Sequence, residues 1–229
     1  MITNGTHKGC EVAVKIIDLE KYDNESIDDI KKEIKIMNLC SHKNVIKCHV
    51  SFLVDATIWI VMPIFEGGSL KDVLLSDKYK NGVKDEANIA YIMREVLEGL
   101  KYFHEQGQIH RDIKCSNIFV DALGNIKIGD FGVSASLVGG QKRGTFVGSP
   151  CWMAPEVISR VGHDAKADIW SLGITAIELS QGSAPYHDMT AMKIIISILN
   201  NASPKLFPGF STYFNDFVNL CLQKDHRKR

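Results

Sequence analysis

The sequence predicts an α+β fold with two unequal lobes, and three observations lead to this expectation. The first third of the 229 residues shows strand and helix patterns in the order strand, helix, strand, strand. Gly67-Gly68 interrupts this order, and beyond it apolar residues recur mainly at helical spacing. We therefore expect a small β-rich lobe and hinge in residues 1–66 and a larger helical lobe in residues 67–229, together forming one domain.

Three strands and one helix are expected in the small lobe. Residues 11–17 are rich in β-branched side chains, which is typical of a strand. Apolar residues recur at helical spacing, with charges between them, at Ile27, Ile30, Ile34 and Met37. Residues 45–53 and 57–62 are expected to form paired strands around a turn at residues 54–56.

The large lobe is expected to be mostly helical. A stripe of apolar residues from Ile89 to Phe103 predicts a long helix, which Gly107 would end. Residues 129–150 have no period and are rich in Gly, Ser and Thr, so they predict a long loop of the kind that is usually functional. Short strands are expected in residues 117–120 and 125–128, and further helices in residues 165–180, 189–199 and 214–222.

Composition limits the kind of partner. Lys plus Arg and Asp plus Glu number 27 each, and this formal net charge of zero argues against a nucleic-acid binder. The longest apolar stretches, residues 58–65 and 194–199, are too short to span a membrane. Residues 1–9 lack the apolar core that a signal peptide would have. No two of the six cysteines form a Cys-x-x-Cys pair. We expect a cytoplasmic or nuclear protein with no nucleic-acid partner and no membrane insertion.

The segment His110-Arg-Asp-Ile-Lys-Cys-Ser-Asn117 matches the catalytic-loop pattern of protein kinases at five positions. Three more kinase motifs occur in the expected order: Val12-Ala-Val-Lys15, Asp130-Phe-Gly132 and Ala154-Pro-Glu156. Taken singly, these residues have ordinary explanations, such as solvated lysines, turn residues or core side chains. Their joint order predicts phosphoryl transfer, whereas His110 itself is expected to be a packed structural histidine.

Phosphoryl transfer depends on positioning and on charge stabilisation, and residues of these motifs are suited to both. Asp112 would accept a hydrogen bond from the substrate hydroxyl and orient it for in-line attack. Lys114 would offset charge on the transferring γ-phosphoryl group. Asn117 and Asp130 would supply hard oxygen ligands to Mg²⁺, which bridges the phosphates.

The remaining ATP contacts are expected from the small lobe and the hinge. Lys15 would bind the α- and β-phosphates, held in place by a carboxylate of the first helix that we assign to Glu33. The adenine ring would contact Ala13, Met62, the carbonyl of Pro63 and the N–H of Phe65. Ser69 and Asp72 predict a capping box at the start of a helix, and the sequence leaves open whether one of them also contacts ribose.

From Cys10 to Arg229 the chain resembles a eukaryotic serine/threonine protein kinase domain. The run from Thr145 to Glu156, with Cys-Trp-Met-Ala-Pro-Glu at its end, more specifically resembles the sterile-twenty-like group and its Fray-type, oxidative-stress-responsive branch. The resemblance implies a bilobal protein-kinase-like fold and the use of ATP with Mg²⁺, or alternatively Mn²⁺. It also implies transfer of the γ-phosphoryl group to Ser or Thr of protein substrates in a stress or ion-homeostasis signalling cascade.

The same resemblance implies regulation of the long loop. Thr145 matches the activation-loop phosphosite, which an upstream kinase would modify, and its phosphate would pair with Arg111. An unmodified loop hydroxyl is the alternative for Thr145. Ser149 matches the residue that hydrogen-bonds Asp112 and Lys114 and shapes the acceptor pocket.

The resemblance implies two further structural contacts, and the chain departs from the family pattern in three places. Asp168 would pin the backbone of the catalytic loop, and Glu156 would pair with Arg229. The family has a Gly-x-Gly-x-x-Gly loop before the Val-Ala-Val-Lys strand, whereas only 14 residues precede Lys15 here. The family continues beyond the position of Arg229, and His226 stands where it usually has proline.

We therefore expect an incomplete small lobe without its first strands and a large lobe truncated at its end. The leading hypothesis is an enzyme, a protein serine/threonine kinase. The alternative is a truncated, weakly active or inactive isoform that acts as a binding or scaffold module, because the glycine-rich loop covers the phosphates in the family.

Overall fold

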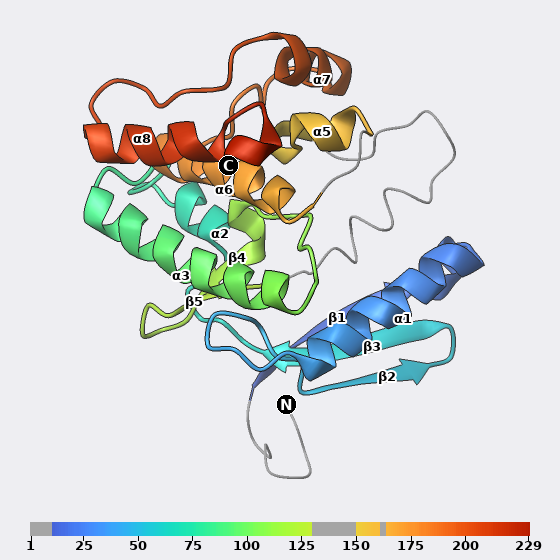
Figure 1. The fold of residues 1–229 in the computed structure, drawn as a ribbon. Helices are drawn as coiled ribbons and strands as arrows, with labels where there is room; N and C mark the ends of the chain where they lie inside the picture. Colours follow the sequence, from blue (N-terminus) through green and yellow to red (C-terminus); the bar gives the residue numbers. More distant parts are fainter. Residues whose placement is uncertain (1–10, 130–149, 161–163) are drawn as a thin grey trace.

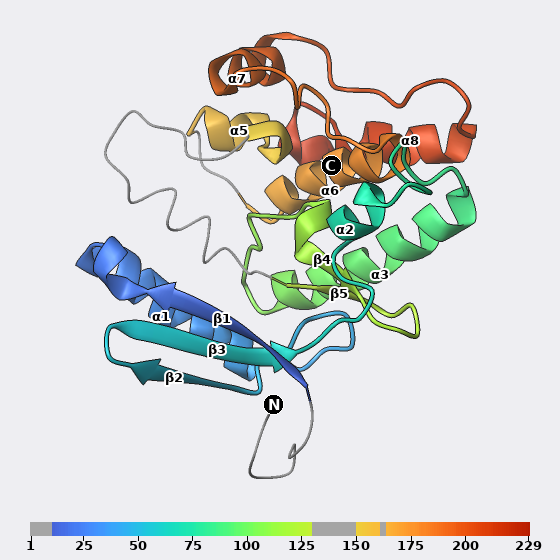
Figure 2. The same ribbon diagram turned by 180° about the vertical axis from the view of Figure 1, so that it is seen from behind.

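The computed structural model describes residues 11–129, 150–160 and 164–229, except for the side chains of residues 24–26, 29, 32, 33 and 36. Figures 1 and 2 show two parts: a sheet with one helix beside it, and a larger assembly of helices. This arrangement confirms the predicted α+β fold with a small β-rich lobe and a larger helical lobe.

The small lobe is a three-stranded antiparallel sheet with α1 (Asn24–Leu39) packed along it (Figure 1). Its strands are β1 (Val12–Asp18), β2 (Val50–Val54) and β3 (Thr57–Pro63), in the order β1-β3-β2. Each strand alternates between two faces, so one face can be buried while the other stays exposed. Residues of one sheet face and of the predicted α1 stripe enter the core, namely Ile17, Ile58, Ile60, Ile30, Ile34 and Met37.

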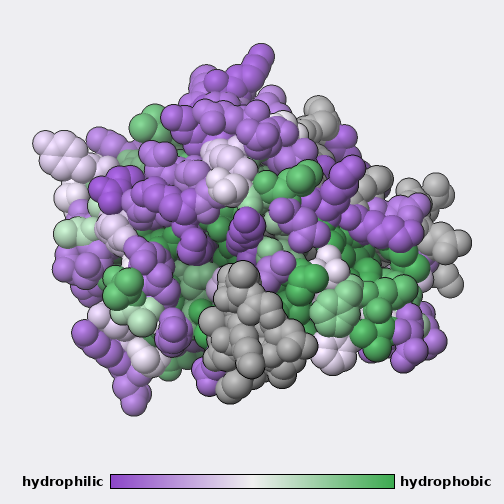
Figure 3. All heavy atoms as spheres, turned by 90° about the horizontal axis from the view of Figure 1, so that it is seen from below, coloured by the Kyte–Doolittle hydropathy of each residue, from purple (hydrophilic) through white to green (hydrophobic). Residues whose placement is uncertain are grey.

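The other face of this sheet is apolar and partly exposed, most of all at Val14, Ile16, Val50 and Phe52. By register, Val14 and Val50 flank Val61, and Ile16 and Phe52 flank Trp59. The rings of Phe52 and Trp59 stack at a centroid distance of 6.1 Å. Figure 3, viewed from below, shows apolar side chains gathered on this side of the molecule.

The second predicted strand begins later than expected, at Val50 instead of residue 45. Val45 forms an isolated parallel bridge with Ile128, and Ile46 donates its N–H to the carbonyl of Ile128 at 2.9 Å. Ile128 in turn donates to the carbonyl of Asn44 at 2.8 Å. Val45 and Ile46 are therefore held against the large lobe instead of extending the hairpin.

A carboxylate of the large lobe anchors this junction. Glu95 Oε2 accepts hydrogen bonds from Asn44 Nδ2 and Lys43 Nζ, both at 2.9 Å, and Arg94 contacts Oε1 at 2.9 Å. Asn44 Nδ2 also donates to the carbonyl of Ile126 at 2.9 Å. The hydrogen bonds from Asn44 and then Lys43 lower the pKa of Glu95 from 4.5 to about 2.

The large lobe is built around one central helix, α6 (Lys166–Gln181), which is apolar on all sides and almost wholly buried. The longer helices around it are α3 (Glu86–Glu105), α7 (Ala191–Asn200) and α8 (Thr212–Cys221). Shorter elements are α2 (Leu70–Leu75), β4 (Ile118–Val120), β5 (Ile126–Ile128) and α5 (Pro155–Ile158). Single 3-10 turns lie at η1 (Leu19–Lys21), η2 (Cys115–Asn117), η3 (Pro150–Trp152) and η4 (His226–Lys228).

The helix ends follow local chemistry. α2 begins with the predicted capping box, in which Ser69 and Asp72 exchange hydrogen bonds. α6 is followed by Gly182, whose φ is 88°. A Cβ at this position would lie 2.4 Å from the carbonyl oxygen of Lys80, so only glycine fits there. α5, which the sequence did not predict, starts at Pro155, where the missing N–H costs nothing. In the described part of the chain, no helix is long and apolar enough to cross a membrane.

Candidate active site

The loop between α3 and β4 brings Asp112, Lys114 and Asn117 together. Lys114 Nζ lies 2.9 Å from Asp112 Oδ2, and Asn117 Nδ2 donates to the same oxygen at 2.7 Å. Asn117 Nδ2 also donates to the backbone carbonyl of Asp112 at 2.8 Å. Both side-chain contacts reach Oδ2, so within the described residues Asp112 Oδ1 remains as the second acceptor of a partly exposed carboxylate. This arrangement suits a carboxylate that accepts a proton from a hydroxyl group.

The backbone of this loop is held by Asp168 of α6, which is fully buried. Asp168 Oδ2 accepts the N–H of His110 and Oδ1 accepts the N–H of Arg111, each at 2.8 Å. His104 Nε2 lies 2.8 Å from Asp168 Oδ2. Arg111 has a φ of 69°, an uncommon conformation for a residue other than glycine, and these hydrogen bonds stabilise it.

His110 is buried, and both of its ring nitrogens lie near backbone groups. Its Nδ1 lies 3.3 Å from Asp112 N and its Nε2 lies 3.2 Å from the carbonyl of Gly129. With Nδ1 as acceptor and Nε2 as donor, a neutral imidazole satisfies both contacts. This environment agrees with the packed histidine expected from the sequence.

The end of the loop meets the segment that leads to Asp130. Gly129 donates its N–H to the carbonyl of Asn117 at 2.9 Å, so the residue that precedes Asp130 lies beside Asn117. Because Asn117 Nδ2 is engaged with Asp112, Oδ1 remains, and the hydroxyl of Ser116 contacts it at 3.3 Å. A hard amide oxygen at this place fits a Mg²⁺ ligand. Asp130, Thr145 and Ser149 lie outside the described residues.

Lys15 and Ala13 lie on one face of β1. In the register Ala13 is opposite Met62 and Lys15 is opposite Ile60. Since side chains alternate along a strand, Lys15 shares its face with the buried Ile17 and not with the exposed Val14 and Ile16. Glu33 lies within α1, which packs beside this sheet, but its side chain is outside the described part of the chain.

The hinge follows β3, which ends at Pro63, and it is hydrogen-bonded to β4. Gly67 N–H donates to the carbonyl of Val120 at 3.0 Å, and Val120 N–H donates to the carbonyl of Gly68 at 2.9 Å. A Cβ on Gly67 would come within 2.8 Å of the Val120 oxygen, so glycine is required there. The ring of Phe65 lies 5.7 Å from that of Phe119, measured between centroids.

Ser69 is committed to the start of α2. Its hydroxyl donates to Asp72 Oδ2 at 2.6 Å and its N–H donates to the same oxygen at 2.8 Å. These hydrogen bonds lower the pKa of Asp72. The buried Ser69 therefore has a complete capping role, and its contact with ribose stays a prediction.

Glu156 and Arg229 form a buried ion pair. Arg229 Nη2 donates to Glu156 Oε2 at 2.6 Å, with the Arg229 side chain 0% exposed and the Glu156 side chain 8% exposed. Arg229 Nη1 also donates to the carbonyl of Lys166 at 2.9 Å, and the guanidinium lies 5.4 Å from the ring centroid of Trp170. The pair thus fastens α5 to the start of α6.

Glu178 of α6 was not among the residues predicted from the sequence. Its Oε2 accepts the backbone N–H of Cys115 and the indole N–H of Trp152, both at 3.0 Å. Burial, followed by the charge of Glu178, raises the pKa of the Cys115 thiol well above its ordinary value. Cys115 and Cys151 are both buried, so neither fits a reactive thiol beside the catalytic loop.

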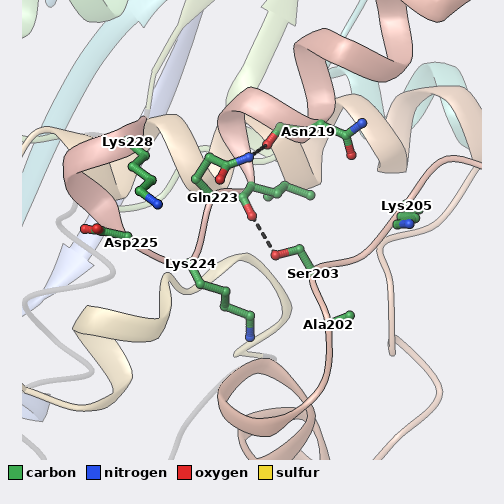
Figure 4. Close-up of a pocket in the computed structure, with 9 residues that line it drawn as sticks. Ala202, Ser203, Lys205, Asn219, Gln223, Lys224, Asp225 and Lys228 are labelled. Atoms are coloured by element: carbon green, nitrogen blue, oxygen red, sulfur yellow. Dashed lines mark hydrogen bonds between the residues drawn. The ribbon is translucent and has the colours of Figure 1, made fainter.

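A pocket of about 390 Å³ lies at the other end of the large lobe, between the segment after α7 and the end of α8. In Figure 4, Ser203 donates to the carbonyl of Leu222 at 2.6 Å and Gln223 donates to Asn219 at 2.8 Å. Lys224 Nζ donates to the carbonyl of Ile198 in the last turn of α7. None of the predicted site residues lines this pocket, so it is separate from the candidate active site.

Comparisons with known proteins agree with the geometry. The family model described as Protein kinase domain matches residues 2–229. The chain is 46% identical to the serine/threonine-protein kinase fray2 of Dictyostelium discoideum over 224 residues, covering 95% of this chain and 22% of that protein. It is 46% identical to germinal center kinase 3 of Caenorhabditis elegans over 243 residues, covering 96% and 41%.

The serine/threonine-protein kinase sid1 of Schizosaccharomyces pombe is 44% identical over 220 residues, covering 95% of this chain and 45% of that protein. The chain therefore spans less than half the length of each of these three relatives.

Proposed function

The chain belongs to the protein kinase domain family, and on that premise we propose that it transfers the γ-phosphoryl group of ATP to serine or threonine hydroxyls of protein substrates. The observation that carries the proposal is the cluster of Asp112, Lys114 and Asn117, joined by contacts of 2.7 to 2.9 Å around one carboxylate oxygen. Relatives that are named as serine/threonine kinases support the choice of acceptor.

In the proposed reaction the substrate hydroxyl oxygen forms a bond to the γ-phosphorus while the bond from that phosphorus to the bridging β-oxygen breaks and ADP leaves. Asp112 orients the hydroxyl through Oδ1 and receives its proton, because Oδ2 is engaged with Lys114 and Asn117. Lys114 places a positive charge beside the transferring group.

ATP is proposed to lie between the small lobe and the catalytic loop. Lys15, held by Glu33, would bind the α- and β-phosphates, and the adenine would lie against Ala13, Met62, Pro63 and Phe65. Asn117 and Asp130 would hold Mg²⁺, which would neutralise charge on the phosphates when bound. The hard oxygen of Asn117 next to Asp112 supports this assignment, and Mn²⁺ suits the same oxygen ligands.

Regulation is proposed to act through Thr145, modified by an upstream kinase. Arg111 supports this role, because its backbone is held by Asp168 while its side chain is exposed and its charge is suited to a phosphate. Ser149 would shape the acceptor pocket by bonding Asp112 and Lys114. The Fray-type resemblance favours a stress or ion-homeostasis cascade, with the protein acting in the cytoplasm or nucleus.

A non-catalytic scaffold role is not favoured. A scaffold has no need for a carboxylate, a lysine and an amide converging on one oxygen, whereas phosphoryl transfer requires such a cluster. The relatives reported above are also named as kinases.

The proposal is tested by transfer of labelled γ-phosphate from MgATP to a generic Ser- and Thr-containing protein such as casein, followed by phosphoamino-acid analysis. Asp112→Asn should lower the rate by at least about 100-fold, because the orienting carboxylate is lost. The control is Asp77→Asn, which makes the same chemical change at a fully exposed side chain and should leave the rate unchanged. Equal rates in wild type and Asp112→Asn, or label on tyrosine alone, would refute the proposal.

A further inference from the structure

The pocket at the end of α8 concentrates positive charge. Its charged lining residues are three lysines and one aspartate, namely Lys205, Lys224, Lys228 and Asp225. The lysines come from the segment after α7, the segment after α8 and η4, and Figure 4 shows them on three sides of the pocket. Because the whole chain has a formal net charge of zero, this excess of positive charge is a local feature that favours an anionic ligand.

The one acidic residue of the pocket is already paired. Arg227, which does not line the pocket, donates from Nε to Asp225 Oδ1 at 3.0 Å and from Nη2 to Asp225 Oδ2 at 3.1 Å. These hydrogen bonds lower the pKa of Asp225, and the charge of Lys228 contributes less. Lys205 and Lys228 form no salt bridge with any residue that the structure describes. Their charges are therefore available to a ligand.

The third lysine is held in place. Lys224 Nζ donates to the carbonyl of Ile198 and lies 5.7 Å from the ring centroid of Trp170. Partial burial lowers the pKa of Lys224, so a bound anion would offset part of the cost of burying its charge. An ammonium group has three N–H donors, and the Ile198 carbonyl takes up one of them. Lys224 can therefore bind an anion without giving up this contact.

The neutral lining residues narrow the class of ligand. Asn219 is exposed, Gln223 donates to its backbone carbonyl at 2.8 Å, and such side-chain amides suit the N–H and C=O groups of a peptide. No aromatic side chain lines the pocket to stack a nucleotide base, and Ala202 and Leu222 give too little apolar surface for a lipid chain. No arginine lines it to bind a phosphate through two parallel hydrogen bonds. Separate lysine charges with amides between them fit the carboxylates of a peptide.

We propose that this pocket binds an acidic peptide segment of a protein partner, one that carries several aspartate or glutamate side chains close together. The carboxylates contact Lys205, Lys224 and Lys228, and the peptide backbone contacts Asn219 and Gln223. The pocket is separate from the candidate active site, and binding to it requires no phosphoryl transfer. The inference therefore stands or falls independently of the proposed function.

Fluorescence anisotropy of the full chain with a labelled peptide that contains four consecutive glutamates tests the proposal, in the absence of ATP. Binding should saturate, and the same peptide with glutamines should bind at least about tenfold more weakly, because the carboxylates provide the attraction. Raising the NaCl concentration from about 50 mM to about 300 mM should weaken binding severalfold, because salt screens exposed charges.

The matched variants locate the binding site. The double variant Lys205→Gln and Lys228→Gln should bind the glutamate peptide about tenfold more weakly. The double variant Lys80→Gln and Lys101→Gln is the control, since it makes the same change in net charge at exposed lysines outside the pocket, and its affinity should stay within about twofold of wild type. Asn219→Glu places a negative charge at an exposed lining residue and should weaken binding without removing a lysine.

Hydrogen exchange measured by mass spectrometry gives a second readout. The bound glutamate peptide should lower amide exchange in residues 202–205 and 222–228 and leave residues 110–117 of the catalytic loop unchanged. Three results would overturn the inference: no saturable binding by wild type, equal loss of affinity in the two double variants, or protection of these residues by inositol hexakisphosphate and not by the peptide.

Discussion

Glu95→Gln tests how the junction of the two lobes is held. The carboxylate of Glu95 has its pKa lowered from 4.5 to about 2, first by the hydrogen bond from Asn44 and then by that from Lys43. This difference corresponds to about 3 kcal/mol of stabilisation. Lys43 and Arg94 are 68% and 65% exposed, so solvent screens their share and we expect about 1–2 kcal/mol.

The direction of the pH dependence follows from the lowered pKa. Because the folded state binds the proton of Glu95 more weakly than the unfolded state, the stabilisation is fully present above pH 4.5 and is lost as the pH falls toward 2. Glu95→Gln should therefore be less stable than wild type by about 1–2 kcal/mol at pH 7, and this gap should narrow by about half at pH 3.

Urea unfolding of wild type and Glu95→Gln at pH 7, 5, 4 and 3 measures the gap directly. Glu98→Gln is the matched control, since Glu98 is an exposed residue of the same helix and should give no gap at any pH. A gap for Glu95→Gln that stays constant from pH 7 to pH 3, or widens, would refute the electrostatic explanation.

Two further predictions concern buried packing. Arg229→Met should lower the free energy of unfolding by about 3–5 kcal/mol, because Glu156 is left as an uncompensated buried charge, whereas Arg227→Met at an exposed side chain should change it little. Thermal or urea unfolding decides this, and equal effects of the two substitutions would contradict it. Gly129→Ala should cost about 1–3 kcal/mol, because its Cβ would lie 2.5 Å from Cδ1 of Ile46. Adding Ile46→Val removes that methyl group and should recover part of the lost free energy of unfolding. If the double variant is no more stable than Gly129→Ala, the contact with Ile46 Cδ1 is not the cause of the destabilisation.

Local patterns predicted much of the fold. The spacing of Ile27, Ile30, Ile34 and Met37 predicted α1, and the pair Ser69 and Asp72 predicted the cap of α2, because both depend on residues only three or four positions apart. The same holds for the catalytic loop, whose cluster of Asp112, Lys114 and Asn117 lies within six residues.

Contacts between residues that are distant in the sequence could not be predicted from such local patterns. Residues 45–53 were expected to form one strand, yet Val45 and Ile46 pair with Ile128, more than 80 residues later. Glu178 is one of two carboxylates in the mostly apolar α6, and nothing near it in the sequence indicates that its partners are Cys115 and Trp152. When a polar group is buried by residues distant in the sequence, no local periodic pattern indicates that contact.

The ion pair of Glu156 and Arg229 has a consequence for synthesis of the chain. Arg229 covers Trp170 and bonds the carbonyl of Lys166, which is made 63 residues earlier. At about 5–20 residues per second, a ribosome needs about 3–13 s to add the residues between them. During that interval Glu156 has no arginine to neutralise it and one side of α6 lacks its cover. The contacts of Arg229 with Glu156 and with the start of α6 therefore form only after the whole segment from Glu156 to Arg229 has been made.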